Sequence, residues 1–379
     1  MLLTGTVACQ ETKFERLDAL LKKTYQPHQP GAAVGIVQGG KLVFEKYYGM
    51  ANLEDSTPIS PVTNFNIASI TKQFTAAAIL QLVEKKKISL NDTLKKFFPQ
   101  LHPALGNTVT IYHLLTHTSG IKEHYPYIDT KPGMHVFDQD VLKAAEKMDS
   151  LYFPPGTNYR YSNTAYCLLA QIIEQVDSLD YRRYLKDNIF NPLGMTKSDV
   201  INMAGLAYVR ATGYAYDPAK KLFTRSDAME NVFFSTQGDG GIYTSLRDYI
   251  KWFNGLQNES ILPKAWTDEA RQIQYLIDSS KRLGYGFGWF VGALQKPAVV
   301  YHTGSNGGFR AIVITIPSEN HALIIFSNRT GIDLEKLAVE INRIFKSENK
   351  SLQPIDSLIS FNDSWPIFAP CKKISRYLI

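Results

Sequence analysis

The feature that most constrains the fold is the placement of strand-forming residues at both ends of the chain. Residues 32–49 indicate two strands joined at Gly39-Gly40, a dipeptide typical of a tight hairpin. From about residue 286 onwards, short runs of β-branched and aromatic residues indicate a series of antiparallel strands. We therefore expect the first and last strands to share one sheet, with the residues between them forming an insertion.

The insertion is predicted to be largely helical. In residues 66–88 the apolar side chains recur near the 3.6-residue period of a helix. An α/β lobe of residues 31–64 and 284–349 would then adjoin a helical lobe of residues 65–283, and a cleft between two lobes is a natural ligand site. Further helices are predicted at 110–116, 139–148, 162–176, 180–189, 245–255 and 335–345.

The two termini fall outside these lobes. Residues 1–30 form an N-terminal segment that begins with a short apolar run, MLLTGTVACQ. This run resembles the end of a bacterial lipoprotein signal in which Cys9 is acylated, and a frayed terminus is the alternative. The lipoprotein interpretation implies a lipid anchor to a membrane and a location outside the cytoplasm, such as the periplasm. Residues 350–379 form a tail for which the sequence predicts no role.

Composition argues against several classes of protein. The net charge of +6 comes from 41 basic and 35 acidic residues spread along the chain, without the basic stripe of a nucleic-acid-binding protein. Three cysteines are too few and too far apart for a disulfide framework or a cysteine-rich metal site. His113 and His117 have a spacing that can ligate a metal from one helix face, but no third ligand accompanies them. We expect no metal or other cofactor, and the oligomeric state is not predicted.

A serine and a lysine stand three residues apart at the start of the first long helix, in FNIASITKQF. A serine hydroxyl is a weak nucleophile until its proton is removed. At a helix start, Ser69 would lie where free N–H groups and the helix dipole favour negative charge. Lys72 shares its helix face and can reach the hydroxyl. The same spacing occurs twice elsewhere, so a capping serine and a surface lysine remain the alternative.

The segment PPGTNYRYSN supplies a second candidate element, Tyr161-Ser162-Asn163. A phenol can pass a proton if a neighbouring cation lowers its pKa from about 10. The Asn163 amide could hold both Lys72 and a substrate carbonyl. The alternative is a tyrosine packed in the turn before a helix.

A third element, His302-Thr303-Gly304-Ser305, ends an apolar run. A strand that ends in glycine lets a substrate backbone lie close to it. The Ser305 N–H could then pair with the Ser69 N–H as an oxyanion hole. Taken alone, the same residues are typical of an ordinary strand end.

Together and in this order, the three elements resemble those of the penicillin-recognising serine hydrolases. The likeness is greatest to the group of class C β-lactamases, D-alanyl-D-alanine carboxypeptidases, D-aminopeptidases and related esterases. The segments LLTHTSGI, FPPGTNYRYSN and GDGGIYTSLRDY also resemble this group, and the likeness extends over residues 31–345. It implies an α/β, β-lactamase-like fold, in which an antiparallel sheet is flanked by helices and carries an inserted all-α domain.

The resemblance also implies a mechanism and a substrate class. Ser69 would attack a carbonyl while Lys72 and Tyr161 manage its proton, giving an acyl-serine intermediate. Class C β-lactamases carry lysine where this chain has His302, and histidine is mostly neutral at pH 7. We therefore expect a D-amino-acid peptidase, a carboxypeptidase or an esterase, with a true β-lactamase or a non-catalytic penicillin- or cell-wall-fragment-binding module as alternatives. The expected substrate-binding residues are Asn163, His302, Thr303, Gly304 and Ser305.

Overall fold

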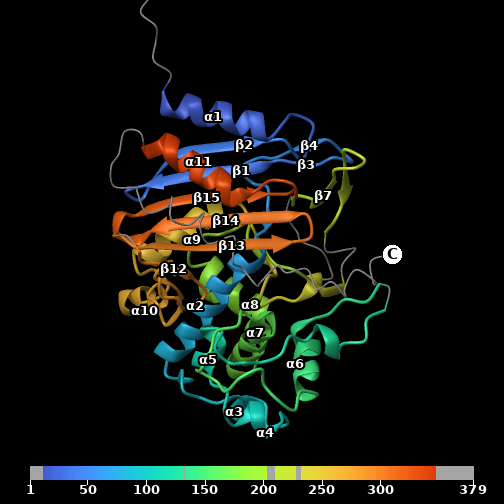
Figure 1. Ribbon diagram of the computed structural model, residues 1–379, viewed down its shortest axis with the longest axis vertical. Helices are drawn as coiled ribbons and strands as arrows, with labels where there is room; N and C mark the ends of the chain where they lie inside the picture. Colours follow the sequence, from blue (N-terminus) through green and yellow to red (C-terminus); the bar gives the residue numbers. More distant parts are fainter. Residues whose placement is uncertain (1–11, 132, 203–209, 228–231, 295, 347–379) are drawn as a thin grey trace, which may run out of the picture.

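A computed structural model describes residues 12–131, 133–202, 210–227, 232–294 and 296–346. Cys9 and the 350–379 tail, on which two of the expectations above depend, lie outside the described residues. The main element is an eight-stranded antiparallel sheet with the strand order β10-β11-β12-β13-β14-β15-β1-β2 (Figure 1).

The first and last strands share this sheet, as the sequence predicts. The hairpin of β1 (Ala32–Gln38) and β2 (Lys41–Tyr48) turns at Gly39 and Gly40, which have φ values of 55° and 76°. Left-handed values of this kind favour glycine and match the twist of a hairpin. Strand β1 also pairs along its length with β15 (His321–Ser327), so the sheet joins residues about 290 positions apart. The remaining strands are β10 (Tyr275–Asp278), β11 (Leu283–Tyr285), β12 (Phe290–Gly292), β13 (Val299–Asn306) and β14 (Phe309–Ile316).

One side of the sheet, which we call the outer face, is covered by α1 (Lys13–Thr24) and α11 (Leu334–Lys346) (Figure 1). Their buried leucines and alanine pack on β-branched side chains of the strands, among them Ile314. Helix α1 is not predicted from the sequence, which instead suggests a separate N-terminal segment for these residues. The helix contributes Leu17 and Leu21 to the apolar cluster of the sheet, so it is part of the α/β lobe.

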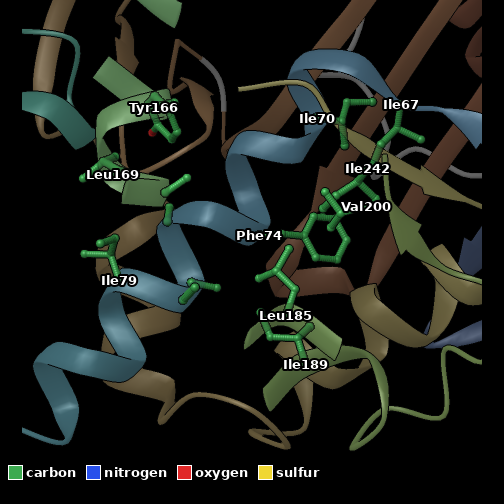
Figure 2. Packing of buried hydrophobic residues seen from close by; sticks show 14 of the residues in the cluster. Ile67, Ile70, Phe74, Ile79, Tyr166, Leu169, Leu185, Ile189, Val200 and Ile242 are labelled. Atoms are coloured by element: carbon green, nitrogen blue, oxygen red, sulfur yellow. The ribbon is translucent and has the colours of Figure 1, made fainter. Parts of the chain in front are cut away.

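The opposite side, the inner face, packs against the helical lobe. At the centre of this lobe lies α2 (Thr71–Glu84), which is buried on every side over most of its length. Figure 2 shows Phe74 of α2 directed toward Leu185 and Ile189, while Ile79 faces the helix that carries Leu169. A helix that is buried all round can fix its side chains from every direction.

The other predicted helices are confirmed, with bounds that shift by one or two residues. The segment 180–189 consists of α8 and a π-helical turn, Lys186–Phe190. The helices of the lobe, together with α9 and α10 beside the sheet, are α3 (Leu94–Phe97), α4 (Pro103–Gly106), α5 (Ile111–Leu115), α6 (Asp138–Glu146), α7 (Asn163–Asp177), α8 (Tyr181–Leu185), α9 (Leu246–Gln257) and α10 (Lys264–Ala270). None of the helices in the described part of the chain has the length and apolar character needed to cross a bilayer.

The predicted helix at 66–88 was wrong at its start. Asn66 belongs to a short strand, β5 (Phe65–Asn66), and Ala68 has a left-handed φ of 48°. A 3₁₀ turn, Ala68–Ile70, follows, and the α-helix begins only at Thr71. The Ala68 N–H donates to the Asn66 side chain at 2.9 Å, which stabilises this bend. Apolar periodicity does not report such a reversal, because the residues on both sides of it are buried.

Candidate active site

Ser69 lies in the 3₁₀ turn that leads into α2, where the lobes meet. Its side chain is half-buried, so its hydroxyl is accessible, whereas both neighbours, Ala68 and Ile70, are buried. The turn places Ser69 at the N-terminal end of α2, where the helix dipole stabilises negative charge.

Lys72 is fully buried, with 0% of its surface exposed. Its Nζ donates to Ser69 Oγ at 3.1 Å, to Asn163 Oδ1 at 2.9 Å and to the Asp239 carbonyl at 2.8 Å. An ammonium carries three N–H donors, so these three acceptors satisfy it completely. The lysine is therefore fixed beside the serine and is not a surface residue.

Tyr161 and Asn163 reach the same place from the start of α7. The Tyr161 ring lies under the amine, with Lys72 Nζ 4.8 Å from the ring centroid. Asn163 is the first residue of α7, whose N-cap is Ser162, and its Nδ2 donates to the Tyr125 hydroxyl at 3.0 Å. The helix start thus orients the phenol and the amide together around Lys72.

The net pKa shift of Tyr161 is opposite to the one that the sequence suggested. Burial raises the pKa of the phenol above its usual value, although Lys72 and Ser69 oppose this rise. Desolvation disfavours the phenolate more than the nearby cation favours it. Tyr161 therefore carries its proton at neutral pH.

His302, on β13, is buried, with 1% of its surface exposed. Its Nδ1 lies 2.7 Å from the Thr303 carbonyl, which can only accept, so Nδ1 holds the proton. Its Nε2 then accepts from the Tyr285 hydroxyl at 3.2 Å. Burial, helped by the charge of Lys72, lowers the pKa of His302 to about 3. The imidazole is neutral and both of its nitrogens are occupied.

Gly304 allows β13 to lie directly against the turn that carries Ser69. A Cβ at this position would come within 2.3 Å of the Ile67 carbonyl oxygen. Within the described strands, β12 pairs with β13 only from Val299 to Tyr301, whereas β14 pairs with it as far as Asn306. Thr303, Gly304 and Ser305 therefore lie where one edge of β13 is open.

Several residues that complete the site were not predicted from the sequence. The Asp239 carbonyl holds Lys72, Tyr125 holds Asn163 and Tyr285 holds His302. The only signal was the segment GDGGIYTSLRDY, which contains Asp239 but gave it no role. His117 contacts the active site independently of His113. The Nδ1 of His117 accepts from the Ser162 N–H at 3.1 Å, and its ring packs on Tyr161.

A buried group of possible metal ligands lies next to this site. Side-chain ligand atoms of Asp138, Cys167 and Asp239 lie within 4.8 Å of one another. Burial raises the pKa of Asp138 to about 8 and raises the pKa of the Cys167 thiol well above its ordinary value. Metal ligands must be deprotonated, so these two groups are poorly suited to a cation at neutral pH.

The chain is similar to known proteins over most of its length. A family model described as Beta-lactamase matches residues 13–342. Penicillin-binding protein 4* of Bacillus subtilis is 29% identical over 333 residues, which cover 84% of this chain and 73% of that protein. The structure of an octameric penicillin-binding protein homologue from Pyrococcus abyssi has a TM-score of 0.76 at 27% identity, covering 89% of this chain and 78% of that one. A penicillin binding protein from Bacillus halodurans gives a TM-score of 0.75 at 25% identity, covering 87% and 98%.

The family match extends across both lobes and includes all three elements of the site. The sheet with its flanking helices is the β-lactamase-like fold that the sequence predicts. The chain belongs to the beta-lactamase family of penicillin-recognising serine hydrolases.

Proposed function

We propose that this protein is a serine hydrolase that forms an acyl-Ser69 intermediate with ester or amide substrates. The observation that carries the proposal is the buried Lys72 Nζ, held 3.1 Å from Ser69 Oγ by Asn163 and the Asp239 carbonyl. A buried lysine beside a half-exposed serine is a suitable base for a nucleophile.

In the proposed acylation, Lys72 first releases one proton to solvent, keeps two N–H donors for Asn163 and the Asp239 carbonyl, and accepts the Ser69 proton on the freed lone pair. The Ser69 Oγ forms a bond to the substrate carbonyl carbon, and the carbonyl electron pair moves to its oxygen. We assign the oxyanion to the Ser69 and Ser305 N–H groups, since Gly304 brings β13 against the Ser69 turn. The bond to the leaving group then breaks, and water later hydrolyses the acyl ester.

Tyr161 has the role of proton donor in this scheme. Because burial keeps the phenol protonated, it can protonate the departing oxygen or nitrogen and then recover a proton from Lys72, whose Nζ lies 4.8 Å from its ring centroid. Asn163 would hold the substrate carbonyl with the amide hydrogen that Tyr125 leaves free.

The neutral His302 favours substrates without a carboxylate at this position. Its ring is buried and both nitrogens are engaged, so it offers no positive charge to an anion. We therefore favour short esters and D-amino-acid peptides over β-lactams, with slow acylation by penicillin. Contact with the substrate would come from the backbone of Thr303–Ser305, with His302 holding the strand in place.

The test combines labelling with a substrate panel. A fluorophosphonate should label the wild type at one site and leave Ser69→Ala unlabelled. The value of kcat/KM should be lower for nitrocefin than for a p-nitrophenyl ester or a D-amino-acid peptide. A nitrocefin rate near the diffusion limit would support a true β-lactamase. Absence of both labelling and turnover would support a non-catalytic binding module.

A location outside the cytoplasm is also proposed, and the mass of the protein from its native host would reveal acylated Cys9.

A further inference from the structure

The loop at 237–241, which supplies the Asp239 carbonyl to Lys72, is bound from two opposite sides. Three consecutive carbonyls point toward the Ser69 side: Gly238 accepts from Thr75 Oγ1 at 2.6 Å, Asp239 from Lys72 Nζ at 2.8 Å, and Gly240 from Asn66 Nδ2 at 3.2 Å. The carbonyls of Gly238 and Asp239 therefore face α2, and that of Gly240 faces β5, which precedes the Ser69 turn.

The Gln237 and Gly238 amides of the same loop face Asp138, the first residue of α6. Asp138 Oδ2 accepts from the Gln237 N–H at 3.2 Å and from the Gly238 N–H at 3.0 Å, and Oδ1 lies 3.1 Å from the first of these. Asp138 is 4% exposed, so no solvent competes for these amides. A buried N–H without a partner is energetically costly, so the carboxyl strongly favours this one orientation of the loop.

The loop is closely packed, which leaves it few alternative backbone conformations. A Cβ at Gly238 would lie 2.4 Å from the Tyr166 carbonyl oxygen and 2.6 Å from Ala170 Cβ, both on α7. The loop is thus pressed against α7, tied to α2 by its carbonyls and tied to α6 by its amides. Rotation of the Asp239 peptide would break the contact to Lys72.

We propose that Asp138 is a positioning residue, which fixes the Asp239 carbonyl and through it holds Lys72 Nζ beside Ser69. This inference deepens the proposed function and rests on it. The acceptor oxygen of Asp138, not a negative charge, carries the effect. This agrees with the pKa of about 8 that burial gives the carboxyl, which keeps it mostly protonated at pH 7.

The test compares Asp138→Ala, which removes the acceptor, with Asp138→Asn, whose amide oxygen can replace Oδ2. A displacement near 1 Å in an active site can reduce the rate about 100-fold. We expect kcat to fall about 10- to 100-fold in Asp138→Ala, with KM unchanged within about threefold, because Lys72 acts on the serine proton. Asp138→Asn should retain kcat within about threefold. Glu146→Ala, at the exposed end of the same helix, is the matched control and should behave as wild type.

Wild-type kcat in Asp138→Ala, or an equal loss in Asp138→Asn, would overturn the inference. If Asp138→Ala does not fold, Thr75→Val, which releases the Gly238 carbonyl from the other side of the loop, should show the same fall in kcat at constant KM. A crystal structure of Asp138→Ala gives a readout without activity: the distance from Lys72 Nζ to the Asp239 carbonyl should exceed 3.5 Å. An unchanged distance overturns the inference, whereas an inactive wild type contradicts the proposed function instead.

Discussion

The outer and inner faces of the sheet are packed in different ways. The outer face, under α1 and α11, is filled mainly by aliphatic and aromatic side chains. The inner face and the helical lobe packed against it also bury Lys72, Asp138, His117 and His302. Burying such groups costs free energy unless each finds partners. The outer face stabilises the fold, whereas the inner face uses partner contacts to hold reactive groups in place.

The largest expected effect is on chemistry at the inner face. Lys72→Met should slow acylation of Ser69 about 1000-fold, because the serine loses the base that lies 3.1 Å away. Stopped-flow measurement of acylation with a p-nitrophenyl ester would give the rate. Lys122→Met is the matched control, since Lys122 follows Ser119 at the same spacing but binds Ser150. Equal losses in both variants would show that the burial of Lys72 has no catalytic meaning.

The second effect is on stability at the outer face. Ile314→Ala should reduce the free energy of unfolding by about 2–5 kcal/mol, because the residue is 0% exposed and its removal leaves a cavity. Urea unfolding measures this change, and kcat should stay at the wild-type value wherever the variant is folded. Val43→Ala, on the edge strand β2 and 37% exposed, should cost less than about 0.5 kcal/mol. A fall in kcat for folded Ile314→Ala would mean that the two faces are coupled.

A third variant tests the contact between β13 of the sheet and the turn that carries Ser69. Gly304→Ala should lower kcat about 10- to 100-fold, since its Cβ would meet the Ile67 carbonyl at 2.3 Å and push β13 away from Ser69. Steady-state kinetics on the preferred ester would show it. Gly106→Ala, whose closest contact is 3.4 Å, should leave kcat unchanged. Wild-type kinetics in Gly304→Ala would imply that the strand can move without loss of function.

A further prediction concerns the dependence of stability on pH. The pKa of His302 is about 3 in the folded protein, below the value of 6.5 for an exposed histidine. As pH falls below 6.5 the unfolded chain binds this proton first, so stability is lost between pH 6.5 and pH 3. The loss is about 1.4 kcal/mol per pH unit once pH is well below 6.5. His302→Gln should therefore show a shallower decline in urea unfolding measured from pH 7 to pH 5.

His321→Gln is the control for this measurement. His321 packs on Phe345 at the outer face. Burial lowers the pKa of His321 to about 4. Its replacement should flatten the pH dependence of stability to a similar extent but leave kcat unchanged. An undiminished slope in both variants would contradict the neutral state of the two histidines.

Much of the architecture could be predicted from local patterns. Gly39-Gly40 marked the first hairpin, the β-branched runs marked the last strands, and three short elements marked the site. Two errors have a physical cause. The left-handed Ala68 interrupts the helix before Ser69 without changing its apolar pattern. The pKa of Tyr161 depends on burial, which a sequence does not show.

The partners of the site were harder to predict than the site itself. Asp138 binds amides about 100 positions away, and the Asp239 peptide offers only its carbonyl to Lys72. Every residue carries the same backbone groups, so the sequence does not show which of them will bind a side chain. The residues that hold Lys72, Asn163 and His302 in place therefore became visible only in three dimensions.

Strand β12 pairs with only the first part of β13, and this limits the length of a ligand that can bind along the remaining edge. Among the described strands, β12 does not pair with β13 beyond Tyr301, and β13 ends at Asn306, before the turn at Gly307-Gly308. At about 3.3 Å per residue, an extended ligand would have room for about five residues along this edge. The number of hydrogen bonds available on β13, more than contacts with side chains, would then limit the length of the extended part of a ligand.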